Sequence, residues 1–126
     1  MKNNDIIEQI INESIGNSLI WEAVDPREYE RIIFNCQYVF KAYITQVNKK
    51  DKSFNLLFIE KKYPDQHFDY DGNCETYFPE IIVFKDNTVI GTFNENNAEK
   101  DDLIRLSSII NTNNNNMEMF KSIFDA

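Results

Sequence analysis

The spacing of apolar residues predicts a helix near each end of the chain. Five isoleucines recur at helical spacing between Asp5 and Gly16, and Gly is favoured just past a helix end, so the first helix is expected over residues 5–15. A second helical pattern begins with a cap at Asn97 and places apolar residues at 103, 104, 106, 109 and 110. The polar tract 111–116 is expected to end this helix, because it has nothing to bury, before a short amphipathic segment.

The stretch between residues 26 and 47 fits two periodicities. Asp25 and Pro26 provide an acidic N-cap followed by Pro at the first helical position, which favours a helix start. The apolar residues that follow are three or four positions apart, but the even positions from 32 to 44 also alternate as in a strand. Since an unbroken strand of more than about a dozen residues is rare, one long helix is the preferred interpretation.

Four further apolar runs predict strands. The runs 18–24 and 54–60 are short and compatible with buried strands. The runs 80–86 and 88–94 flank a polar corner in which Asp86 and Asn87 suit a tight turn, so these two runs are expected to form a β-hairpin.

The stretch FPEIIVFKDNTVIGTF, residues 78–93, resembles the C-terminal half of the thioredoxin fold. In that family a cis-proline precedes the first strand of such a hairpin, and the last helix packs across it. The resemblance covers roughly residues 18–111 and implies a cis Phe78–Pro79 bond. It implies an α/β, thioredoxin-like domain, which is expected over residues 1–111. The composition of residues 112–126 predicts an Asn-rich linker and a short C-terminal helix.

The same resemblance implies a four-stranded mixed sheet with helices on both faces. The expected strand order is 54–60, 18–24, 80–86, 88–94. The first and last main helices are expected to share one face, because a right-handed crossover places the helix over 26–47 on the other.

The position of the family's Cys-X-X-Cys motif is occupied by Asp25-Pro26-Arg27-Glu28, which cannot exchange disulfides. The leading interpretation is a redox-inactive protein-binding domain, acting as an adaptor or inhibitor. Its expected surface comprises Trp21, Asp25, Arg27, Tyr77, Phe78 and Pro79, or else the acidic C-terminal half of the chain. Each also has a structural explanation, with Trp21 in the core and the charges capping a helix. The alternative is an atypical thiol-dependent redox enzyme using Cys74 or Cys36.

Composition and charge narrow the class of partner. A chain of 126 residues with 42% hydrophobic content is expected to form one domain, and the absence of a long apolar run predicts a cytoplasmic protein with reduced thiols. The net charge is −8, and residues 64–126 carry four Lys/Arg against twelve Asp/Glu. Phosphates repel such a surface, so nucleic acid is not an expected partner, whereas a basic protein is. A membrane is not expected either, because no apolar run approaches the roughly 20 residues that a span needs.

The acidic loop 63–76 matches a calcium-binding loop only in part. Asp69 and Asp71 precede Gly72, but the first ligand position falls on His67 and the twelfth, where a bidentate Glu belongs, on Phe78. A solvated acidic turn is therefore preferred. No metal and no cofactor is expected, and no spacing of residues indicates a catalytic site.

Overall fold

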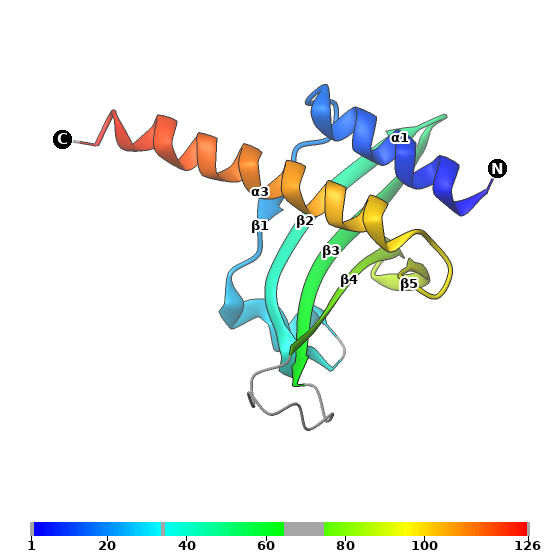
Figure 1. The fold of residues 1–126 in the computed structure, drawn as a ribbon. Coiled ribbons are helices and arrows are strands. Elements are labelled where there is room, and N and C mark those ends of the chain that lie inside the picture. Colours follow the sequence, from blue (N-terminus) through cyan, green and yellow to red (C-terminus); the bar gives the residue numbers. More distant parts are fainter. Residues whose placement is uncertain (1, 34, 65–74, 126) are drawn as a thin grey trace.

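The computed structural model describes residues 2–33, 35–64 and 75–125, and it shows an α+β fold. Within these ranges five strands form one antiparallel sheet in chain order, β1-β2-β3-β4-β5 (Figure 1). The strands are β1 (Glu22–Ala23), β2 (Val39–Lys49), β3 (Lys52–Pro64), β4 (Glu75–Lys85) and β5 (Thr88–Phe93). The helices are α1 (Asn3–Ile15), α2 (Tyr29–Ile32) and α3 (Lys100–Ser122), with the 3-10 turns η1 (Pro26–Glu28) and η2 (Cys36–Tyr38).

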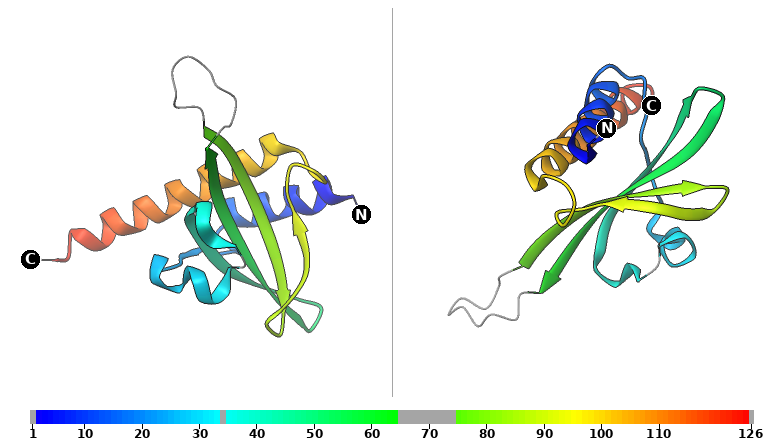
Figure 2. Two further views of the ribbon diagram at one scale, coloured as in Figure 1. Left: turned by 90° about the horizontal axis from the view of Figure 1, so that it is seen from below. Right: turned by 90° about the vertical axis from the view of Figure 1, so that its right-hand side faces the viewer.

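Helices α1 and α3 pack against each other on one face of the sheet, as Figures 1 and 2 show. The fully buried Ile7 and Ile11 of α1 meet Leu106 of α3 in one core cluster with Phe58 and Ile81 of the sheet. Burying each such side chain contributes about 1.5–3 kcal/mol. The expectation that the first and last main helices share a face is confirmed.

The opposite face of the sheet is covered by the short segment that contains η1, α2 and η2. Its Tyr29 and Ile33 pack on Ala42, Leu57 and Ile59 in a second core cluster. Strand β3 is therefore buried on both faces, which explains its unbroken apolar run. The predictions of a helix over 5–15, a strand over 54–60 and a hairpin near 80–94 are confirmed.

The prediction of a mixed, thioredoxin-like sheet is wrong, and so is the prediction of a long helix over 26–47. The helical segment ends at Ile33, whose φ of −118° and ψ of 118° are extended, and Asn35 takes a left-handed φ of 58°. Residues 39–49 then form β2, which pairs antiparallel with β3 from Val39 to Lys49. The alternation of apolar residues reflects this pairing, which local helix signals do not reveal.

The predictions of a strand over 18–24 and of a cis Phe78–Pro79 bond are also wrong. Only Glu22 and Ala23 join the sheet, at the edge beside β2, so the predicted strand order does not arise. No cis peptide bond occurs among the described residues, and the Phe78–Pro79 bond is trans. Pro79 lies within β4, but pairing with β5 begins only at Ile81, so its missing N–H removes no hydrogen bond on that side.

The predicted break of the last helix at 111–116 is wrong, because α3 continues to Ser122. The asparagine side chains have partners on the body of the fold. The amide of Asn114 donates to the carbonyl of Trp21 at 3.2 Å, and that of Asn113 donates to the carbonyl of Ser14 at 3.5 Å. These contacts offset the weak helix propensity of Asn.

Candidate functional site

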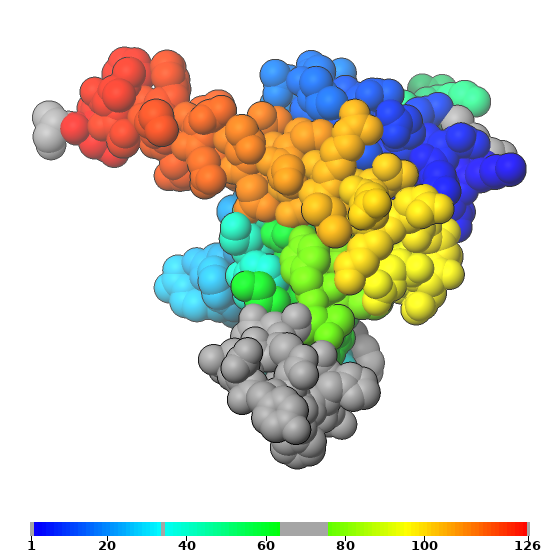
Figure 3. Space-filling model, in the orientation of Figure 1, coloured from blue at the N-terminus to red at the C-terminus, as the bar shows by residue number. Residues whose placement is uncertain are grey.

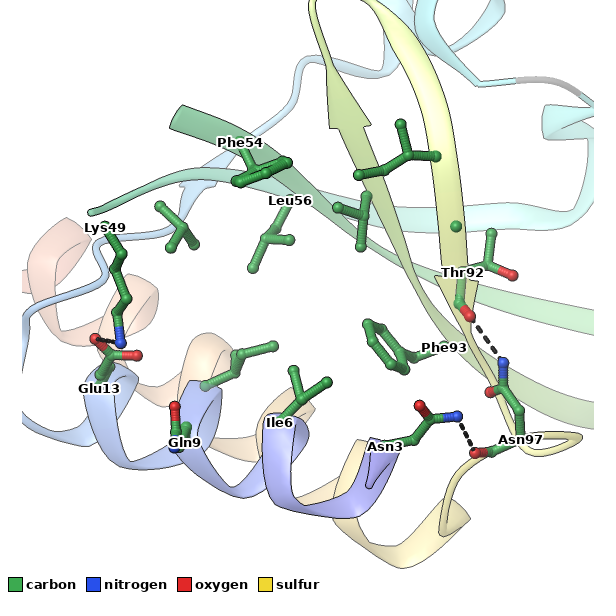
Figure 4. Close-up of a pocket in the computed structure, with 15 residues that line it drawn as sticks. Asn3, Ile6, Gln9, Glu13, Lys49, Phe54, Leu56, Thr92, Phe93 and Asn97 are labelled. Atoms are coloured by element: carbon green, nitrogen blue, oxygen red, sulfur yellow. Dashed lines mark hydrogen bonds and ion pairs between the residues drawn. The ribbon is translucent and has the colours of Figure 1, made fainter. Parts of the chain in front are cut away.

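An apolar groove of about 440 Å³ opens between α1 and the sheet (Figure 4). In this view Ile6 points from α1 toward the sheet, Phe54 and Leu56 come from β3, and Phe93 comes from β5. The full lining comprises Asn3, Ile6, Gln9, Ile10, Glu13, Val47, Lys49, Phe54, Leu56, Val83, Ile90, Gly91, Thr92, Phe93 and Asn97. Pockets of this size that are mainly apolar with a few polar groups are typical of binding sites.

The groove exists because α1 has a wider apolar face than one contact can cover. Ile7 and Ile11 are fully buried, whereas Ile6 is only partly buried and lines the groove. On the sheet side the strands twist, so their ends diverge from the straight helix, as the right-hand view in Figure 2 shows. The space between α1 and the sheet is therefore narrow on the side of α3 and open on the other side.

Polar contacts fix the groove at both ends. At one end the amide of Asn3 donates to the carbonyl of Asn97 at 2.9 Å, and the amide of Asn97 donates to the carbonyl of Thr92 at 2.8 Å. At the other end Lys49 Nζ lies 2.8 Å from Glu13 Oε1. The walls are therefore held in place without a ligand, which reduces the entropy lost on binding.

A second candidate site is a buried polar cluster around Glu60, which is only 3% exposed. The hydroxyls of Tyr77 and Ser107 both donate to Glu60 Oε1, and the amide of Asn111 approaches Oε2 at 3.4 Å. Asn111 Oδ1 in turn accepts from Tyr43 at 2.6 Å and from a lysine on β2 at 2.8 Å. Strands β2, β3 and β4 are thus joined to α3.

The pKa values of two tyrosines in the cluster are raised. Burial raises the pKa of Tyr77 well above its ordinary value, and the hydrogen bond to Glu60 raises it further. Burial also raises the pKa of Tyr43. These tyrosines stay protonated and act as donors, Tyr77 to the Glu60 carboxylate and Tyr43 to Asn111, so the cluster resembles a structural network more than an acid–base pair. No group of side chains that could hold a metal ion occurs in the part of the chain the structure describes.

Three of the residues predicted to form a binding surface lie before α2 in separate environments. Trp21 is buried, its Nε1 donates to Ser14 Oγ at 2.9 Å, and its ring meets Phe58 edge to face. Asp25 and Arg27 form an exposed ion pair at 2.6 Å, and the guanidinium holds the pKa of Asp25 below its usual range. The structural explanations given for these residues, Trp21 in the core and charges that cap a helix, fit their positions.

The other three predicted residues are consecutive on β4. Tyr77 binds Glu60, Phe78 packs beside the ring of Tyr63 at 6.2 Å between centroids, and Pro79 is fully buried. The six predicted residues do not form one surface. Of the two cysteines, Cys36 packs partly buried against the second core, and Cys74 and most of the acidic loop lie outside the described residues.

Protein-family models, curated proteins and solved structures give no match to this chain. The groove is therefore the site that the geometry itself defines. Sequence reasoning missed it, although the five isoleucines of α1 were a signal, since Ile6 and Ile10 widen the apolar face beside Ile7 and Ile11 and line the groove. No helix among the described residues is long and apolar enough to span a membrane.

Proposed function

We propose that the chain is a non-catalytic binding domain whose groove between α1 and the sheet holds an apolar segment of a protein partner. The observation that carries this proposal is the fixed, open and mainly apolar groove. The buried side chains around Glu60 already bond to one another, and Cys36 is the free cysteine among the described residues. Neither provides a comparable site for catalysis.

The shape of the groove favours a polypeptide over a small compact ligand. It follows α1 from Asn3 to Glu13, about 15 Å at the rise of an α-helix. Its apolar surface continues outward along β5 to Ile90, which is 56% exposed. Two or three apolar side chains along one helical or extended segment would fill such a site.

Charge supports a segment with basic flanks. The groove ends at Asn97, and the chain that follows carries Glu99, Asp101 and Asp102 at the start of α3. Opposite charges there would speed association and set the direction in which the segment lies. This retains the expectation of a basic protein partner and transfers it to a different surface.

Addition of the partner as a further strand on β5 is not part of the proposal. The carbonyl of Thr92 already accepts from Asn97, and the β4–β5 register shifts at Val83 and Phe84. Bulges and occupied carbonyls protect sheet edges from further pairing. Recognition would rely on side chains in the groove.

Selection of binders from a displayed library of random 12-residue peptides tests the proposal. The selected peptides are expected to carry paired apolar residues flanked by Lys or Arg. Ile90→Asp should weaken their binding at least tenfold by fluorescence polarisation, equal to about 1.4 kcal/mol. Val89→Asp is the matched control, because Val89 is 53% exposed on the same strand but outside the groove lining.

Two outcomes would contradict the proposal. Peptides whose affinity is unchanged by Ile90→Asp would place binding elsewhere. Failure to select any peptide, combined with saturable binding of a fatty acid that Ile90→Asp abolishes, would replace the protein partner by a small apolar ligand.

A further inference from the structure

The second half of α3 extends beyond the body of the protein with large apolar side chains in solvent. Figures 1 and 3 show this end standing away from the sheet and from α1. The exposed fractions are 52% for Met117, 57% for Phe120, 70% for Ile123 and 71% for Phe124. The rings of Phe120 and Phe124 contact each other edge to face, 5.3 Å between centroids.

These side chains continue the buried face of the same helix. Leu103, Ile110, Met117 and Phe124 recur every seven residues, as do Leu106, Asn113 and Phe120. The first half of this face is covered by the sheet and by α1, which ends at Ile15. A seven-residue apolar repeat is the pattern by which one helix packs along another, so the uncovered half has the form of a helix-pairing surface.

A hollow of about 750 Å³ lies beside this surface. It opens between α3 and the segment 17–23. Its lining is mixed: Leu19, Ile20, Ile110 and Met117 are apolar, and the others include several asparagines, Glu118 and Lys121. Ile20 is 70% exposed there. The amide of Asn114, bonded to the carbonyl of Trp21, fixes α3 at the base of the hollow. One chain therefore presents a projecting pair of rings and, beside it, a fixed hollow that is partly apolar.

The exposed area is close to what a stable dimer needs. With about 200 Å² for a fully exposed aromatic side chain, Met117, Phe120, Ile123, Phe124 and Ile20 together expose about 600 Å². This reaches the upper end for the largest apolar patch of a monomer, about 300–600 Å². Polar neighbours at its rim would bring it near the ~800 Å² per partner of a standard interface.

We propose that this surface binds a second copy of the chain, with the two α3 ends antiparallel about a twofold axis. Phe120 and Phe124 of each copy enter the hollow beside Met117 of the other. Both copies then use the same surface, so the assembly closes at two chains. Glu118 and Lys121 also line the hollow, and the antiparallel arrangement brings Lys121 of one copy near Glu118 of the other.

The dimer surface is separate from the groove proposed for a partner. The groove is lined by α1 from Asn3 to Glu13 and by the sheet, whereas the hollow lies between segment 17–23 and the C-terminal half of α3. Figure 1 shows the ends of the chain on opposite sides of the molecule. Each copy in the dimer keeps its groove free, and the two proposals can fail independently.

Sedimentation velocity of the full chain over a range of concentrations tests the inference. The wild-type protein is expected to reach twice its 14.9 kDa chain mass. Phe120→Asp with Phe124→Asp should raise the dimer dissociation constant at least 100-fold. Met119→Asp is the matched control, because Met119 is 67% exposed but lies outside the seven-residue repeat. Circular dichroism should show that both variants keep their folded signal.

The charged rim provides a second, gentler test. Lys121→Glu places like charges together across the twofold axis and should weaken the dimer about tenfold at low salt. Combining it with Glu118→Lys reverses both charges and should restore the affinity. A wild-type monomer at all concentrations, larger open assemblies, or no response to the phenylalanine changes would overturn the proposal. So would a monomer that binds vesicles of anionic phospholipid through Phe120 and Phe124.

Discussion

The hydroxyl of Tyr77 on β4 donates a hydrogen bond to the buried carboxylate of Glu60 on the neighbouring strand β3. Ser107 of α3 donates to the same oxygen, Oε1. One carboxylate thus connects the sheet to the helix that covers it. A buried charge is tolerated only when hydrogen-bond donors compensate for lost hydration, and this cluster supplies them from β4 and α3.

Glu60→Ala is expected to destabilise the protein strongly. The change leaves the hydroxyls of Tyr77 and Ser107 buried without their acceptor, at a cost of about 2–4 kcal/mol. Urea unfolding at neutral pH measures this loss. Glu30→Ala, at an exposed carboxylate on α2, should change the free energy of unfolding by less than about 0.5 kcal/mol. A loss below about 1 kcal/mol for Glu60→Ala would show that the network adds little.

Stability should fall at alkaline pH in a way that depends on Tyr77. Its pKa in the folded protein is raised, mainly by burial and then by Glu60, above the value of about 10 in an unfolded chain. The native state therefore holds more protons than the unfolded state above about pH 10. The free energy of unfolding is fully present below that pH and decreases as the pH rises further.

Tyr77→Phe is expected to flatten this decline, measured as the slope of unfolding free energy against pH between about 9.5 and 11. Part of the slope should remain, because burial also raises the pKa of Tyr43 and of Tyr29. An unchanged slope in the variant would contradict the assignment to Tyr77.

Ser14→Ala should destabilise the contact between α1 and the chain that follows it. Ser14 Oγ accepts from the indole N–H of Trp21 and donates to the carbonyl of Ile10 at 2.7 Å. Its removal leaves the indole N–H without that acceptor, at a cost of about 1–3 kcal/mol. Trp21 is the only tryptophan, so its fluorescence reports both the local change and unfolding. Ser18→Ala, at an exposed serine, is the control and should have little effect.

Local patterns predicted the elements whose structure is decided locally. The isoleucines of α1 and the turn at Asp86 and Asn87 specify their elements with nearby residues alone. The segment that became β2 has both helical and alternating spacing, and pairing with β3 decides between them. The asparagines of α3 led to the prediction that the helix ends at 111–116. Their hydrogen-bond partners, such as the carbonyl of Trp21, lie 93 positions away in the sequence and are not visible in a local pattern.

Less of the candidate site than of the fold could be predicted from the sequence, because the walls of the groove come from distant parts of the chain. Ile6 faces the groove across from Phe54 and Phe93, and only the antiparallel order of strands brings them together. Tyr77 was named in advance as a binding residue, but its partner Glu60 was not. A Glu within an apolar run was the available signal, because a carboxylate at a buried position requires donors.

The turn between β2 and β3 offers a stabilising change. Lys50 and Asp51 both adopt positive φ, 52° and 62°, which a two-residue hairpin turn of this hand requires and which Asn-Gly satisfies with least strain. Lys50→Asn with Asp51→Gly should therefore raise the free energy of unfolding by about 1 kcal/mol, measured in urea. The turn at Asp86 and Asn87 has φ of 50° and 66° but already carries residues that tolerate this conformation. Asp86→Asn is the control and should add less than about 0.5 kcal/mol. An equal gain at both turns would contradict the assignment of extra strain to Lys50 and Asp51. A loss there would mean that the lysine side chain contributes a contact that outweighs its backbone strain.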